Sequence, residues 1–194
     1  MLNIQPREKQ IVALNMLRGA WKQNNSFMLY APVGFGKTAI AALITDGFVS
    51  REMRVMFVAP YTVLLDQTAT RFMEYGLPGE EISYVWRDHP SYNPTALIQI
   101  ASADTLIRRE FPDNIDLLIV DEVGLQSGTD AEARTLFDII NERYEQRKPT
   151  VFLSNLDLDG VKAALGERVF DRLREDGGEV VTFAWDSHRG RAAA

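Results

Sequence analysis

The octapeptide Ala31-Pro32-Val33-Gly34-Phe35-Gly36-Lys37-Thr38 carries the strongest structural signal in this chain. It matches the phosphate-binding loop of nucleotide-binding proteins, with alanine in place of the first glycine. Its two glycines let the backbone curl so that N–H groups point inward at phosphate oxygens. An apolar run precedes the loop and a helical pattern follows it, whose N-terminus would add a favourable dipole for an anion. The stretch therefore predicts an α/β domain that binds a nucleotide.

Each part of the loop has an expected role toward ATP. The segment Val33, Gly34, Phe35 and Gly36 is expected to surround the phosphates with its backbone. Lys37 would reach the β- and γ-phosphates, and the Thr38 hydroxyl would bind Mg²⁺. A glycine-rich strand-to-helix turn with no ligand is the alternative interpretation, and the strand and helix pattern around the loop disfavours it.

Short β-rich apolar runs alternate with longer segments of helical period along the chain. The expected strands are Phe27–Ala31, Arg54–Ala59, Ile82–Trp86, Leu97–Ala101, Asp116–Asp121, Thr150–Ser154 and Glu179–Ala184. The expected helices are Arg7–Gln23, Lys37–Val49, Thr62–Tyr75, Asp104–Arg109, Asp130–Gln146 and Leu158–Glu175. This alternation predicts crossover connections, a mainly parallel sheet and a three-layer α/β/α sandwich.

A buried strand is followed by two carboxylates downstream of the loop. Leu117–Val120 is apolar on successive residues, as in a central strand covered on both faces. Asp121 would hold Mg²⁺, and Glu122 would orient and deprotonate the attacking water. Both would lie at the carboxyl end of a strand, where open α/β sheets bind their ligands. A glutamate at this position favours hydrolysis over binding alone.

Another expected strand ends in small polar residues, Ser154 and Asn155. If this strand lies beside the one that ends at Asp121, Ser154 or Asn155 could contact the γ-phosphate or the attacking water. The alternative is an ordinary turn at the end of a strand.

Composition excludes several other classes of site. Among 194 residues there is no cysteine and only two histidines, which excludes disulfides, thiolate metal sites and cysteine nucleophiles and disfavours a histidine metal site. No apolar run approaches the roughly 20 residues that cross a bilayer, so a cytosolic protein without a membrane partner is expected. The net charge of −6 confines any nucleic-acid contact to a local basic stripe.

Up to Glu122 the chain resembles the first RecA-like domain of superfamily 2 helicases. The matching segments are Arg7–Gln10, Ala31–Thr38, Phe57–Gln67, Ala101–Leu106 and Asp121–Glu122. The resemblance implies that Gln10, with Arg7, recognises adenine. It also implies that single-stranded DNA contacts Tyr61 and Thr62, with Arg108 and Arg109 on its phosphates. Arg51, Arg54 and Arg71 surround the motif at Phe57–Gln67 and are candidates for the same basic rim, although a solvated helix face is the alternative.

The remainder resembles DnaC-type replicative-helicase loaders, which are AAA+ ATPases. The matching segments are Asp121–Gln126, Arg147–Thr150, Leu165–Arg172 and Trp185–Arg189. By this resemblance Asn155 is a sensor residue, and Arg172, or alternatively Arg168, is an arginine finger that reaches a neighbouring subunit. Ion pairing within the helix is the alternative role for both arginines.

These observations predict one ATPase domain over residues 1–187, helicase-like over 1–122 and loader-like over 121–189, with a flexible tail at 188–194. The length leaves no room for a second motor domain, so autonomous unwinding is not expected. The expected function is a MgATP-dependent accessory protein of DNA replication in the cytoplasm of a bacterium or phage-infected cell. It would act on DNA or a replicative helicase, with hydrolysis completed by self-association or a partner. Two alternatives are a nucleotide-dependent binding module with negligible turnover and a natural or engineered helicase–loader hybrid without a cellular task.

Overall fold

A computed structural model describes residues 2–122, 130–167, 170–171 and 179–182. Its strands are β1 (Ser26–Tyr30), β2 (Val55–Ala59), β3 (Ile82–Val85), β4 (Ile98–Ser102), β5 (Leu117–Val120), β6 (Thr150–Ser154) and β7 (Glu179–Thr182). Its helices are α1 (Glu8–Ala20), α2 (Lys37–Val49), α3 (Thr62–Glu74), α4 (Ala103–Arg108), α5 (Asp130–Glu145) and α6 (Leu158–Leu165), with a short 3₁₀ turn at Gly79–Glu81.

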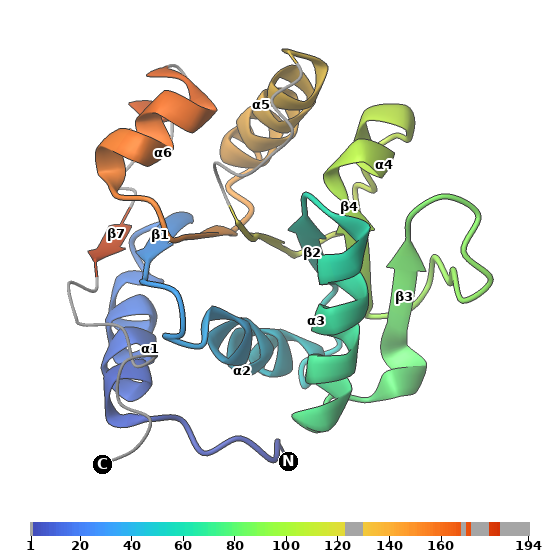
Figure 1. Cartoon of the computed structure of the whole chain (residues 1–194), viewed down its shortest axis with the longest axis horizontal. Helices are drawn as coiled ribbons and strands as arrows, with labels where there is room; N and C mark the ends of the chain where they lie inside the picture. Colours follow the sequence, from blue (N-terminus) through green and yellow to red (C-terminus); the bar gives the residue numbers. More distant parts are fainter. Residues whose placement is uncertain (1, 123–129, 168–169, 172–178, 183–194) are drawn as a thin grey trace.

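The strands form one sheet in the order β3-β4-β2-β5-β6-β1-β7, and every strand pair in it is parallel. Helices α1, α2 and α3 cover one face, and α4, α5 and α6 cover the other (Figure 1). Successive strand residues therefore enter different cores: Phe57 packs with the first helix layer, and Met56 and Val58 pack with the second. The expected three-layer α/β/α sandwich with a parallel sheet is confirmed.

One predicted helix is wrong in its extent. The helix expected over Leu158–Glu175 ends at Leu165, because Gly166 adopts φ 80°, a left-handed conformation that interrupts the helix. Helical structure resumes at Glu167, whose carboxylate lies 2.8 Å from Lys162 Nζ across this break.

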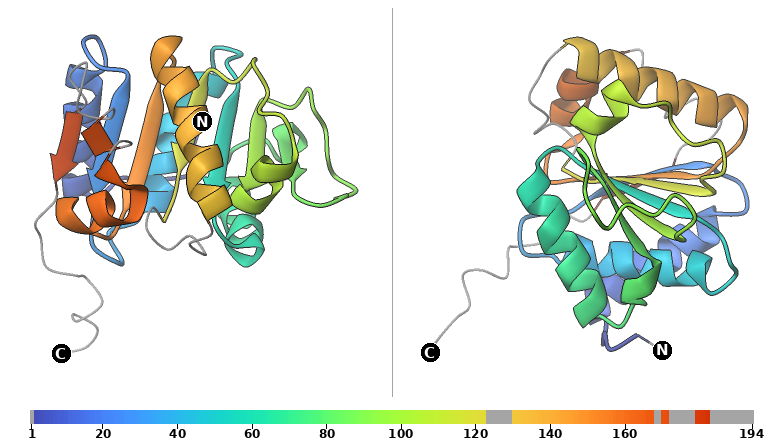
Figure 2. Two further views of the ribbon diagram at one scale, coloured as in Figure 1. Left: turned by 90° about the horizontal axis from the view of Figure 1, so that it is seen from above. Right: turned by 90° about the vertical axis from the view of Figure 1, so that its right-hand side faces the viewer.

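The strand order decides which loops meet. β6 lies between β1 and β5, with Tyr30 opposite Ser154 and Val120 opposite Phe152. Since parallel strands end at one edge, the residues that directly follow β1, β5 and β6 lie at the same edge of the sheet, which Figure 2 shows between its two helix layers. The phosphate loop, the carboxylate pair and Asn155 are thus brought to one place.

Arg143 of α5 joins β5 and β6 at the opposite edge. Its guanidinium is buried and donates hydrogen bonds to the carbonyl oxygens of Ile115 (2.9 Å), Asp116 (3.1 Å) and Pro149 (2.8 Å). It also donates to Thr150 Oγ1 at 3.2 Å. Burial lowers the pKa of this guanidinium to about 10, which leaves it charged at neutral pH. The contacts fix the strands that carry the carboxylates and Asn155.

Candidate nucleotide-binding site

The loop between β1 and α2 has the curled backbone that its glycines predict. Gly34 has φ 88° and Gly36 has φ 90°, values that residues with a Cβ rarely adopt. A Cβ at Gly36 would also lie 2.5 Å from Gln10 Nε2, so the Gln10 amide would have to move to admit it. Helix α2 then begins at Lys37 without an acidic residue in its first turn. The backbone N–H groups of the loop and the N-terminus of α2 therefore present positive potential to an anion, and no acidic side chain in the first turn of the helix offsets it.

Gln10 and Arg7 of the first helical segment contact this loop directly. Gln10 is only 4% exposed, and its Nε2 donates to the Phe35 carbonyl oxygen at 2.8 Å. Its Oε1 accepts from the Arg7 backbone N–H at 2.9 Å, and Arg7 Nη1 donates to the Gly34 carbonyl oxygen at 3.4 Å. The structure places both residues beside the loop as supports, and their recognition of adenine stays a prediction.

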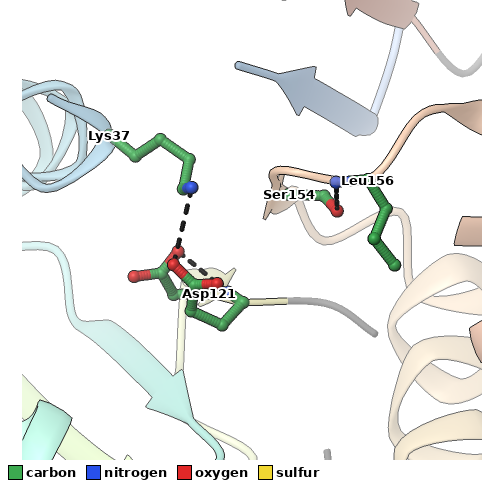
Figure 3. A network of polar contacts seen from close by, with 5 residues as sticks. Lys37, Asp121, Ser154 and Leu156 are labelled. Carbon is green, nitrogen blue, oxygen red and sulfur yellow. Dashed lines mark hydrogen bonds and ion pairs between the residues drawn. The ribbon is translucent and has the colours of Figure 1, made fainter. Parts of the chain in front are cut away.

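The two carboxylates after β5 face the loop lysine. Lys37 Nζ lies 3.5 Å from Glu122 Oε1, and Figure 3 shows the Lys37 side chain reaching toward the carboxylates at the end of β5. Asp121 is 8% exposed; burial and the nearby Glu122 raise its pKa to about 6, against a smaller lowering by Lys37 and the Glu122 backbone N–H. Glu122 has φ 53°, an uncommon value for a residue with a side chain. A charged, strained pair next to a phosphate loop is typical of a catalytic site.

The residues after β6 complete this edge. Ser154 Oγ accepts a hydrogen bond from the Leu156 N–H at 3.0 Å, so it turns back onto its own chain (Figure 3). Asn155 Oδ1 is buried and has no hydrogen-bond partner among the described residues. A buried amide oxygen without a partner is costly. This oxygen therefore makes Asn155, rather than Ser154, the candidate for contact with a ligand or its water.

The residues present fit MgATP. Thr38, Asp121 and Glu122 line one cavity of about 460 Å³, and a hydroxyl and a carboxylate are the hard oxygen ligands that Mg²⁺ prefers. Helix α3 supplies the other wall of this cavity with Asp66, Gln67 and Arg71, residues that motif spacing did not assign to the nucleotide site.

A separate groove of about 660 Å³ lies along the same edge, at the ends of β2, β4 and β3. Tyr61, Thr62, Arg108 and Arg109 all line it, so the structure brings together the four residues expected to contact nucleic acid. Tyr61 is 49% exposed. The contact with DNA itself stays a prediction.

Other expected members of this rim are elsewhere. Arg51 and Arg54 precede β2, so the length of the strand separates them from Tyr61, which follows it. Arg71 pairs with Glu74 at 2.8 Å and lines the carboxylate cavity instead. The predicted rim was wrong for these three because neighbours in sequence lie at opposite ends of a strand or on another helix face.

The groove also contains residues that the motifs did not indicate, namely Trp86, Arg87 and Asp88 after β3. Their position at the end of the expected strand Ile82–Trp86 and directly after it was the available signal, because parallel strands share an edge. Arg168 and Arg172, the candidate arginine fingers, lie outside the described residues.

Together, the curled loop, the facing carboxylates and one parallel sheet define a phosphate-loop NTPase domain of the RecA/AAA+ class. The family described as "Type III restriction enzyme, res subunit", a superfamily 2 helicase-like group, matches residues 3–148, and the chain belongs to this family.

Curated relatives add the second expected resemblance. The replicative helicase loader DnaC of Buchnera aphidicola is 42% identical over 76 residues, which cover 39% of this chain and 31% of the loader. DnaC of Escherichia coli is 38% identical over 78 residues, covering 40% of this chain and 32% of the loader. The chain thus spans about a third of the length of these relatives. The predicted combination of helicase and loader resemblance is confirmed.

Solved structures agree on the fold. The UvsW helicase of bacteriophage T4 has a TM-score of 0.69 at 20% identity, with 92% of this chain and 60% of that chain covered. DnaA from Aquifex aeolicus has a TM-score of 0.57 at 19% identity, with 93% and 48% covered. The comparisons group the chain with nucleotide-binding, replication-related proteins. In the part of the chain that the structure describes, no helix has the length and apolar character to span a membrane.

Proposed function

We propose that this chain binds MgATP at the edge formed by the ends of β1, β5 and β6, and hydrolyses it as an accessory protein of DNA replication. The observation that carries the proposal is the approach of Lys37 to Glu122 at 3.5 Å, beside a phosphate loop whose glycines adopt positive φ. Thr38 and Asp121 would hold Mg²⁺, which when bound neutralises charge on the phosphate oxygens.

In this scheme Lys37 leaves Glu122 to contact the β- and γ-phosphates. Glu122 then accepts a proton from the water that attacks the γ-phosphorus, and ADP and phosphate are the products. Asn155, with its unpartnered Oδ1, would orient that water or the γ-phosphate. The work done on DNA or on a replicative helicase is inferred from the relatives described as helicase loaders and helicases.

A nucleotide-dependent binding module with negligible turnover is the second candidate. The same Lys37–Glu122 ion pair favours it, because Lys37 holds the expected base at 3.5 Å and must move away before that carboxylate can contact an attacking water.

Binding and turnover of ATP by three variants test the proposal. Lys37→Ala should weaken ATP binding by about 10- to 100-fold, since it removes a charged hydrogen bond to phosphate. Glu122→Gln should retain binding and lose about 100-fold or more of the turnover. Lys22→Ala, an exposed lysine at the end of α1, is the control and should change neither. Absence of ATP binding by the unaltered chain contradicts the proposal, and binding with no turnover supports the second candidate.

A further inference from the structure

The loop that joins β3 to β4, residues 86–97, forms a third wall of the groove that contains Tyr61 and Arg108. β3 is the edge strand, and this loop stands out beyond the sheet there (Figure 1). Trp86, Arg87 and Asp88 at the start of the loop line the groove. None of the helicase-like motifs includes this segment.

Hydrogen bonds to the two flanking strands hold this loop. The Asn93 N–H donates to Ser83 Oγ at 2.8 Å, and Gln99 Nε2 donates to the carbonyl oxygens of Asn93 (3.0 Å) and Ala96 (2.8 Å). The His89 ring stacks on Tyr84 with 4.6 Å between centroids. Because Asn93 and Ala96 are hydrogen-bonded to β3 and β4, this segment can hold a side chain of the groove in a fixed position.

That side chain is Arg109. Its Nη2 donates to the Arg87 carbonyl oxygen at 2.8 Å, and its guanidinium carbon lies 5.3 Å from the centre of the Tyr92 ring. The same Nη2 lies 3.7 Å from Asp88 Oδ1. Arg87 adopts φ 48°, a conformation held by its surroundings at some cost in energy. The loop thus presents one guanidinium to the groove through a carbonyl, an aromatic face and a carboxylate.

The carboxylate differs from the other two contacts. Asp88 is fully exposed, at 107% of its reference area, and an exposed pair at 3.7 Å is weak. A phosphodiester oxygen can therefore replace it, whereas the carbonyl and the ring keep Arg109 in place. Arg108 is paired in the same manner with Asp104 at 3.9 Å, and Asp104 also lines the groove.

We propose that residues 86–97 are a nucleic-acid-binding element in which Arg87 and Tyr92 position Arg109. Asp88 pairs with the Arg109 guanidinium until a phosphodiester oxygen replaces the Asp88 carboxylate. This inference rests on the proposed action on DNA. It adds Asp88, whose carboxylate competes with the phosphodiester, and two positioning residues, Arg87 and Tyr92, to that site.

Binding of a labelled single-stranded oligothymidylate, followed by fluorescence anisotropy at low salt, tests the exchange. Asp88→Asn should tighten binding about threefold, because it removes a competing charge within several ångströms of the phosphate. Tyr92→Ala should weaken binding and reduce its dependence on salt concentration, since Arg109 is then less well positioned. Asp138→Asn on α5, also exposed, is the matched control for net charge and should leave the affinity unchanged.

The outcomes separate this inference from the proposed function. Absence of binding by the unaltered chain at low salt removes the action on DNA and this inference with it, while ATP binding can stand. Binding that Asp88→Asn leaves unchanged, or that Asp138→Asn tightens equally, overturns the inference alone. A gain by Asp88→Asn that fades at high salt, with Asp138→Asn unchanged, supports it.

Discussion

Asp121 shows how a buried metal-ligand candidate affects stability before any ligand binds. Burial raises the pKa of its carboxyl to about 6 from an ordinary value of 3.8. Between about pH 3.8 and pH 6, the Asp121 carboxyl is therefore protonated in a larger fraction of folded chains than of unfolded chains. The contribution of Asp121 to the free energy of unfolding therefore falls as pH rises through this window, by about 3 kcal/mol at most.

We accordingly expect Asp121→Asn to unfold at higher denaturant concentration than the unaltered chain at pH 8 without Mg²⁺. The two proteins should converge below about pH 3, where the carboxyl is mostly protonated in both the folded and the unfolded state. Urea unfolding across this pH range measures the difference, and Asp138→Asn serves as the exposed control. A stability difference that is independent of pH would contradict the assignment.

Gln10 raises a second question at this scale, because both ends of its amide are used within the protein, on Phe35 and Arg7. If its main effect is to hold the loop, Gln10→Ala should weaken ATP and GTP binding together, by several-fold. Titration with both nucleotides measures this. A loss confined to ATP would instead favour the recognition of adenine that the helicase resemblance implies.

At the scale of elements, helix α5 is expected to stabilise the sheet mainly through Arg143. Arg143→Leu would leave the carbonyl oxygens of Ile115, Asp116 and Pro149 buried without this donor. We expect a loss of about 3 kcal/mol or more in the free energy of unfolding. Arg134→Leu, an exposed arginine of the same helix, should cost little. Equal effects of the two substitutions in chemical denaturation would rule out this role.

The elements themselves were largely predictable from local pattern. Each described strand begins and ends within two residues of its expected bounds, because buried parallel strands are short, apolar and bounded by polar residues. The break at Gly166 was missed, since an isolated glycine within a helical pattern can either be tolerated or end the helix. The position of β6 between β1 and β5 depends on contacts between residues distant in sequence. The sequence alone therefore did not predict that β6 lies beside β5, and the role of Asn155 was stated on the condition that it does.

The residues of the site were predictable where a motif indicated both their chemical role and their position at the end of a strand. Lys37, Asp121 and Glu122 met because residues that follow parallel strands share an edge. The same rule applied to Arg87 and Asp88, yet no motif includes them, so their place in the groove emerged only from the structure. Arg54 was wrongly predicted to belong to the basic rim beside Tyr61, because it precedes β2 and therefore lies at the opposite end of that strand.

At the scale of the whole molecule, hydrolysis is expected to require a second copy. The loader resemblance assigns Arg172 a role in trans, and a finger of this kind contributes about 10³–10⁵-fold to turnover. Turnover per chain should then rise with protein concentration. Glu122→Gln and Arg172→Ala should each be nearly inactive alone, for different reasons.

Mixing these two variants distinguishes the arrangements. In a mixed assembly, Glu122→Gln supplies Arg172 to the Arg172→Ala chain, whose own Glu122 is intact, so a sizeable fraction of the activity should return. A finger that acts within its own chain leaves every chain in the mixture defective, and no activity returns. Arg172→Lys should fail to substitute, because lysine lacks the planar fork that contacts phosphate at two points. Recovery on mixing would therefore show that the complete ATPase site is built from two chains.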